Sequence, residues 1–281
     1  MKVDLQEFFK LPLEEKNAYA RLPNGMEGYG QPYIFGQGRK LDWGDMFMLG
    51  SLPASQRNMK FWPENPSSFR ATLDKYSLEL QKVSTCLVKL MAKNLGNNPK
   101  HLTDMFENGR QAMPLDSPYF FKSMKCKVYK SKEIPGAFIV NIGDIIEVMS
   151  NGEYKSVEHK TVLNPEHERF SIAAFHFPNV KAMIGPLQDL VKENGAVYKT
   201  LSNDEFLGLF QKAKLDDGTG YGHGLEEKLK RNREIRKGET GRRKGVWWIF
   251  LGEPSWRGSS LGKTGTVSVG LQRAHPWPLK E

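Results

Sequence analysis

The sequence predicts an α+β fold, with helices flanking a core of β-strands. A long helical pattern begins at Ser67, the apolar period changes to two at Ala137, and helical spacing returns at Pro186. With 281 residues, 39% of them hydrophobic and 26% charged, the chain is long enough for one sizeable core or two small ones.

Composition narrows the class of protein. The chain has two cysteines, Cys86 and Cys126, and neither belongs to a CxxC pair, so we expect no disulfide framework and no zinc module. No apolar run reaches the roughly 18 residues that a membrane span needs, and the N-terminus lacks the apolar segment of a signal peptide. We therefore expect a soluble, cytoplasmic protein without a membrane partner.

Local patterns predict the helices of the first part of the chain. An amphipathic run opens the sequence, and the Gly-rich stretch over residues 23–38 is not expected to be helical. The strongest helix has Ser67 or Ser68 as N-cap and Gly96 as its stop signal. Its apolar residues recur at spacings of three, four and seven, at Phe69, Leu73, Tyr76, Leu80, Leu87, Leu90 and Met91. A short helix is predicted over residues 99–107, with proline at its first position.

Strands are predicted for the middle of the chain. Residues 114–134 show neither a helical period nor alternation, but from Ala137 onward Phe138, Val140 and Ile142 would share one face of a strand. Two further strand-like runs, 154–163 and 169–177, predict an antiparallel hairpin.

Turn and cap signals complete the pattern. Asn151 and Gly152 predict a turn before the hairpin. Two helices are predicted after it, over residues 186–193 and 202–214, and the second opens with a serine and a glutamate at capping-box spacing.

Three residues of the predicted hairpin form the candidate site. Residues two apart on a strand share a face, so Arg169 and Ser171 point the same way, and a register that pairs positions 159 and 171 would add His159. An imidazole can bind a transition metal, while a guanidinium and a hydroxyl can hold a carboxylate. The cluster could therefore bind a metal and a carboxylate together.

Longer stretches resemble one family. The run NIGDIIEVMSNGEYKSVEHKTVLNPEHERFSIAAFHFP is similar to the C-terminal part of the catalytic core of plant 2-oxoglutarate and iron(II) dependent dioxygenases. Upstream, MEGYGQ, KLDWGDMF and FWPENPSSFRATLDKYSLELQKV resemble the helical N-terminal region of the same group. The resemblance implies a double-stranded β-helix, or jelly-roll, core with flanking helices.

The resemblance also implies a chemistry and residue roles. His159 would be the distal histidine of an iron site built from two histidines and one carboxylate, with no catalytic residue beyond the metal site. Arg169 and Ser171, in the family's R-x-S motif, would hold the far carboxylate of 2-oxoglutarate. The family uses O2, benefits from ascorbate, and makes succinate and carbon dioxide as it hydroxylates, desaturates or demethylates a small molecule, here a small plant metabolite.

The sequence departs from the family's pattern in one important motif. The family takes its other two iron ligands from an H-x-D motif, and none of the six histidines here is followed two positions later by Asp or Glu. Several tens of expected residues are replaced by the short stretch 114–134, and Met1 corresponds to a position inside the family's N-terminal region. We therefore expect a partial, incomplete jelly-roll, whose missing strands would leave an open sheet edge.

These observations predict a division of the chain. Residues 1–113 form a truncated helical N-terminal region, 114–134 an atypical junction, and 135–216 the C-terminal part of the dioxygenase core. Residues 217–281 form a basic tail that we expect to be disordered; it carries 13 Lys and Arg against 7 Asp and Glu, or +6 of the formal net charge of +9. Oligomeric state is left open by the sequence.

Alternatives remain for both the metal site and the function. His101 and Asp104, three apart on a predicted helix, could rebuild an iron site, although surface pairs of that spacing are common. The basic run 228–244 could bind polyanions, but a solvated tail explains it as well and no nucleic-acid partner is expected. The leading hypothesis is a dioxygenase, and the alternative is a non-catalytic truncated relative that binds a carboxylate or a partner, or that has no function.

Overall fold

The computed structural model describes residues 1–23, 25–31, 45–116, 138–156, 170–212, 229 and 249–251. The chain forms two compact units, which are interleaved along the sequence. The first unit comprises Met1–Met124, Lys160–Ile184 and Thr200–Asp216, and the second comprises Lys125–His159, Gly185–Lys199 and Asp217–Glu281.

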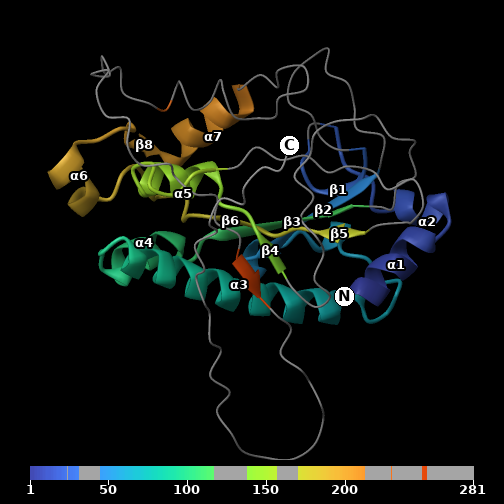
Figure 1. Ribbon diagram of the computed structural model, residues 1–281. Helices are drawn as coiled ribbons and strands as arrows, with labels where there is room; N and C mark the ends of the chain where they lie inside the picture. Colours follow the sequence, from blue (N-terminus) through green and yellow to red (C-terminus); the bar gives the residue numbers. More distant parts are fainter. Residues whose placement is uncertain are drawn as a thin grey trace, which may run out of the picture. The chain divides into compact units, whose positions relative to one another are not determined.

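A five-stranded antiparallel sheet forms the centre of the first unit (Figure 1). Its strands are β1 (Gly28–Gly30), β2 (Met46–Leu52), β3 (Arg110–Asp116), β5 (Ser171–Ile172) and β6 (Phe175–Phe177). The order is β1-β2-β3-β5, and β6 also pairs with β3. A bulge between Gly50 and Leu52 interrupts the register of β2 against β3. This architecture agrees with the predicted α+β class. Strand β3 extends to Asp116, so the first residues of the stretch 114–134, in which the sequence shows no regular period, belong to a strand.

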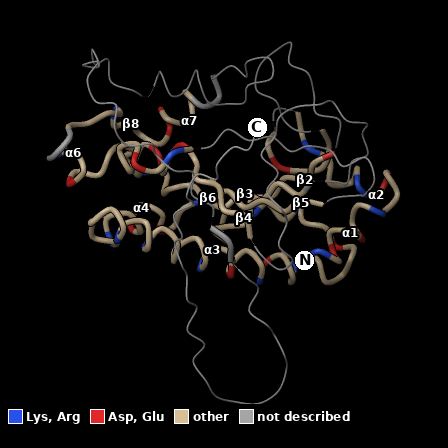
Figure 2. The backbone as a smooth tube through the Cα atoms, in the orientation of Figure 1, with Lys and Arg blue, Asp and Glu red and all other residues tan. Residues whose placement is uncertain are grey.

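Helices and short strands complete the first unit. They are α1 (Lys2–Lys10), α2 (Leu13–Asn17), η1 (Ala54–Gln56), η2 (Met59–Phe61), α3 (Phe69–Asn94), α4 (Pro99–Phe106), β7 (Met183–Ile184), β8 (Leu201–Ser202) and α7 (Asn203–Lys212). Helix α3 runs along the sheet (Figure 1). Helices α1 and α2 each carry both lysine and acidic residues, so charges of both signs lie on these helices (Figure 2).

The predicted helix boundaries of α3 and α4 are confirmed. Helix α3 has Ser68 at its N-cap and ends before Gly96, which adopts φ +69°. The Ser68 hydroxyl does not cap the helix but donates a hydrogen bond to Asp4 of α1. Helix α4 begins at Pro99, and the Asn98 side chain accepts a hydrogen bond of 3.0 Å from the backbone of Lys100.

Aromatic and aliphatic side chains from helices and sheet make one core in the first unit. Its buried members are Leu5, Phe8, Tyr29, Phe47, Leu49, Phe61, Trp62, Phe69, Leu73, Met113 and Leu115. The Phe8 ring stacks on the Phe47 ring with centroids 4.6 Å apart. The N-terminal helix is therefore part of the core that supports the sheet.

The second unit holds β4 (Phe138–Val140), α5 (Asp144–Met149), α6 (Gln188–Asn194) and β9 (Ile249–Leu251). Strands β4 and β9 pair antiparallel, so three residues of the tail expected to be disordered form a strand. The predicted strand over residues 137–142 is wrong at its end, because β4 stops at Val140 and a helix that the sequence did not predict follows Gly143. The predicted turn is confirmed, with φ 53° at Asn151 and 85° at Gly152.

Candidate functional site

Ser171 lies on the face of the sheet that points away from the core of the first unit. In the pairing of β3 with β5, Ile172 lies opposite the fully buried Leu115, and both Phe170 and Ile172 pack against the core. Ser171, between them, lies opposite Asp116 and is half-buried. Because side chains alternate along a strand, the Ser171 hydroxyl is on the other face. The sequence assigns this hydroxyl, together with Arg169, to the predicted carboxylate contact.

The other predicted site residues, His159 and Arg169, lie outside the described residues, as do residues 157–163 of the first predicted hairpin strand. Their assembly with Ser171 stays a prediction. Among the residues that the structure describes, no group of three His, Cys, Asp or Glu side chains could hold a metal ion. The described part of the chain therefore provides no iron site, and the roles of His159 and Arg169 rest on the sequence.

The alternative ligand pair lies on the surface of α4. His101 and Asp104 are both exposed, and the His101 ring lies 3.3 Å from the Asn97 side chain, measured from Nδ1 to Oδ1. No third ligand joins them within the described ranges. The pair has the environment of ordinary surface residues.

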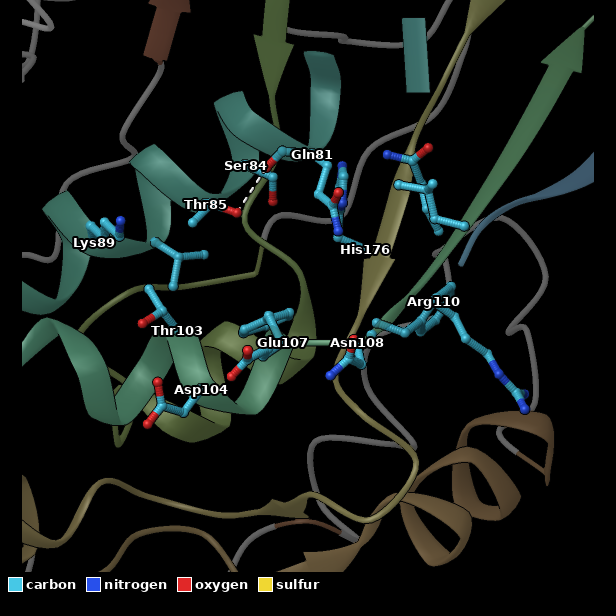
Figure 3. Close-up of a pocket in the computed structure, with 16 residues that line it drawn as sticks. Gln81, Ser84, Thr85, Lys89, Thr103, Asp104, Glu107, Asn108, Arg110 and His176 are labelled. Carbon is cyan, nitrogen blue, oxygen red and sulfur yellow. Dashed lines mark hydrogen bonds between the residues drawn. The ribbon is translucent and has the colours of Figure 1, made fainter. Parts of the chain in front are cut away.

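A cavity of about 440 Å³ lies elsewhere in the first unit, between α3, α4 and the strands β3 and β6 (Figure 3). Its lining includes Gln81 and Thr85 of α3, Glu107 after α4, and His176 of β6. His176 is opposite Gln111, which is buried on the core face of β3. The cavity is thus on the opposite face of the sheet from Ser171 and is not the predicted carboxylate site.

Burial lowers the pKa of the His176 imidazole. Desolvation lowers the pKa of the imidazole from 6.5 to about 4, because a charged ring loses hydration in this environment. The ring therefore stays neutral at physiological pH. It adds no positive charge to the cavity wall.

Two family models match parts of the chain, and relatives match most of it. Residues 114–178 match the 2OG-Fe(II) oxygenase superfamily, and residues 1–65 match the model described as non-haem dioxygenase in morphine synthesis N-terminal. S-norcoclaurine synthase 1 of Coptis japonica is 46% identical over 248 residues, which cover 77% of this chain and 70% of the relative. Codeine O-demethylase of Papaver somniferum is 35% identical, covering 77% and 69%. The chain belongs to the 2OG-Fe(II) oxygenase superfamily.

Solved structures agree with this membership. The crystal structure of JOX2 in complex with 2OG, Fe and JA matches with a TM-score of 0.66 and 26% identity, covering 82% of this chain and 77% of that one. A 2OG-Fe(II) oxygenase family protein from Caulobacter crescentus, at 20% identity and a TM-score of 0.58, shares the fold. The predicted double-stranded β-helix class and the resemblance to plant dioxygenases are both confirmed.

Membership assigns the general class of the chain and the requirements of that class. The chain belongs to the oxidoreductases of the 2-oxoglutarate-dependent dioxygenase type, which act on plant metabolites with iron(II) as cofactor and 2-oxoglutarate and O2 as cosubstrates. No described helix is both long and apolar enough to span a membrane.

One group of residues escaped the sequence analysis. Glu147 of α5 is buried, together with Tyr198 and Asn151 of the second unit. The only sequence signal for Glu147 is a single acid within the apolar run Ile145 to Met149. Its partner at position 198 is too distant in sequence for any local pattern to reveal.

Proposed function

We propose that this chain oxidises a small, largely apolar plant metabolite at an iron site that includes His159, with Arg169 and Ser171 holding the far carboxylate of 2-oxoglutarate. Bound iron(II) would supply the activation of O2 for attack on a substrate C–H bond, while 2-oxoglutarate becomes succinate and carbon dioxide. The guanidinium and hydroxyl would orient the cosubstrate through charge-assisted hydrogen bonds.

The observation that supports this proposal is the alternation at β5. Ser171 is directed away from the core while its neighbours Phe170 and Ile172 pack into it. Arg169 is two residues before Ser171 in the sequence, the spacing that places two strand side chains on one face. A polar pair on that face suits a carboxylate, because at β5 the opposite face is occupied by the core packing of Phe170 and Ile172.

Succinate formation tests the activity directly. The chain would be incubated with 2-oxoglutarate, iron(II) and ascorbate, and His159→Ala would be compared with His101→Ala, a matched change at an exposed histidine of α4. We expect His159→Ala to abolish succinate formation and His101→Ala to preserve it. Equal turnover in all three proteins would exclude His159 as a ligand.

The type of oxidation can be read from the product. Relatives include a codeine O-demethylase and an oxoglutarate-dependent flavonoid 7-O-demethylase, the latter from Ocimum basilicum. We propose hydroxylation, desaturation or demethylation of a compound of comparable size and polarity. Formaldehyde release marks demethylation, the gain of one oxygen atom marks hydroxylation, and the loss of two hydrogen atoms marks desaturation.

A non-catalytic relative is the second candidate, and the absence of an H-x-D motif from the sequence favours it. Such a protein could still bind 2-oxoglutarate through Arg169 and Ser171. It would then bind the cosubstrate in titration calorimetry without forming succinate. Turnover that depends on His159 would eliminate this candidate.

A further inference from the structure

The buried carboxylate of Glu147 is the centre of a polar cluster in the second unit. It accepts three hydrogen bonds of 2.6 Å each, from the Tyr198 hydroxyl, the Lys155 ammonium and the backbone N–H of Ser156. Glu147 is 7% exposed and Tyr198 1% exposed. A carboxylate in such a place is costly unless donors surround it, and here three of them do.

The turn between Glu147 and Ser156 is fixed at several further points. The Asn151 side chain donates a 3.0 Å hydrogen bond to the carbonyl of Gly195 and accepts one of 2.8 Å from the backbone of Val197. The Ser150 hydroxyl accepts a 3.0 Å hydrogen bond from the backbone of Tyr154. The turn is therefore attached both to itself and to the segment that carries Tyr198.

The backbone conformation of Gly152 favours glycine in this turn, and its neighbours are at ordinary contact distance. Its φ of +85° disfavours other residues, and a Cβ added there would lie 3.4 Å from both the Lys155 Nζ and the Tyr198 ring. The Lys155 Nζ lies 5.9 Å from the centre of the same ring. Charge, ring and backbone are thus packed together at the end of the turn.

The bond to Ser156 has a different consequence from the other two. Tyr198 and Lys155 contribute side chains, whereas Ser156 contributes its main-chain N–H, so the carboxylate restrains the course of the polypeptide itself. His159 follows only three residues later in the sequence. This hydrogen bond is therefore the last described restraint on the chain before His159, the predicted iron ligand.

We propose that Glu147 is a positioning residue, whose carboxylate fixes the backbone at Ser156, the described residue from which the chain leads to His159 three positions later. This inference rests on the proposed role of His159 as an iron ligand. Metal sites lose affinity when the residues that orient a ligand are altered, although the ligand itself remains. Glu147 acts through the chain and touches neither metal nor cosubstrate.

Glu147→Gln tests the inference with little change in volume. The amide keeps one oxygen that can accept from Tyr198 and Lys155. Its NH2 group is only a donor, so it cannot accept the hydrogen bond from the Ser156 N–H. Glu153→Gln is the matched control, because Glu153 is an exposed acid of the same turn and loses the same charge.

Hydrogen exchange gives the first measurement. We expect the Ser156 amide to exchange about tenfold faster in Glu147→Gln, because the hydrogen bond that it donates to the buried carboxylate is lost. Glu153→Gln should match the wild type. If Glu147→Gln does not fold, Tyr198→Phe, which removes one donor and keeps the carboxylate, should give a smaller increase at the same amide. Unchanged exchange in the folded variant overturns the inference.

Metal binding gives the second measurement and separates positioning from general stability. Cobalt(II) affinity would be measured well below the unfolding temperature of every variant, with His159→Ala defining the signal from this ligand. We expect Glu147→Gln to weaken the cobalt(II) affinity measured through the His159-dependent signal about tenfold or more. Equal affinity would leave Glu147 a stabilising residue only and refute the positioning role. Failure of wild-type protein to show any His159-dependent signal would refute the proposed function instead, and the exchange result would still decide whether Glu147 fixes the segment.

Discussion

Ser171 lies directly opposite Asp116 in the antiparallel pair of β5 and β3, one position away from the pair that joins Ile172 to the buried Leu115. The side chains of Ser171 and Ile172, adjacent in β5, therefore lie on opposite faces of the sheet. One residue is packed into the core, and the next lies on the face for which the chemistry is proposed.

Replacing Ser171 tests the cosubstrate contact. Ser171→Ala should weaken 2-oxoglutarate binding about 10- to 100-fold, because hydrogen bonds to charged groups contribute about 1.5–3 kcal/mol. The dissociation constant can be measured by calorimetry with iron(II) present and O2 excluded. Ser84→Ala is a suitable control, since Ser84 lines the cavity on the opposite face. Equal affinities in both variants would contradict the assignment of Ser171.

His176 should make stability depend on pH. Its pKa is about 4 in the folded protein against 6.5 for the free side chain, so the unfolded chain takes up the proton first as the pH falls. The folded state should lose on the order of 3 kcal/mol between pH 6.5 and 4 from this residue, and nothing above pH 6.5. Urea unfolding of the wild type and of His176→Gln, near pH 7 and near pH 4.5, measures the difference.

The comparison between variants isolates His176 from the carboxylates that also titrate. His176→Gln should lose less stability than the wild type on acidification. His101→Gln, a change at an exposed histidine, should retain the wild-type loss. Identical acid sensitivity of His176→Gln and the wild type would show that the ring is hydrated in solution.

Phe8 should contribute strongly to the stability of the sheet. Its side chain is fully buried and stacked on Phe47, so Phe8→Ala should cost about 3–5 kcal/mol of unfolding free energy. Val3→Ala on the same helix is the control, because Val3 is 63% exposed. Chemical denaturation measures both, and a cost below about 1 kcal/mol for Phe8→Ala would mean that α1 is not part of the cooperative core.

Local signals explain what the sequence could predict. The pattern of α3 repeats over several turns and ends in a glycine, and α4 begins with a proline after an asparagine cap. Alternation around Ser171 likewise follows from its neighbours alone. The roles of His159 and Arg169 come from family resemblance and remain predictions.

Non-local structure explains what the sequence could not. Helix α5 has six residues, too few for a helical period to be distinguished from an apolar strand. The pairing of Ser171 with Asp116 joins segments far apart in the chain, and so does the contact of Glu147 with Tyr198. Tertiary packing determines such pairs, and they cannot be predicted from the sequence of either segment alone.

The short length of β5 has a consequence for how the protein loses 2-oxoglutarate affinity on heating or storage. Two residues supply few backbone hydrogen bonds, so the register of Ser171 also depends on the packing of Phe170 and Ile172 in the core and on the pairing of β6 with β3. A slip by one position would exchange the two faces and bury the hydroxyl. Loss of 2-oxoglutarate affinity during heating or storage should therefore coincide with loosening of the aromatic core, rather than precede it.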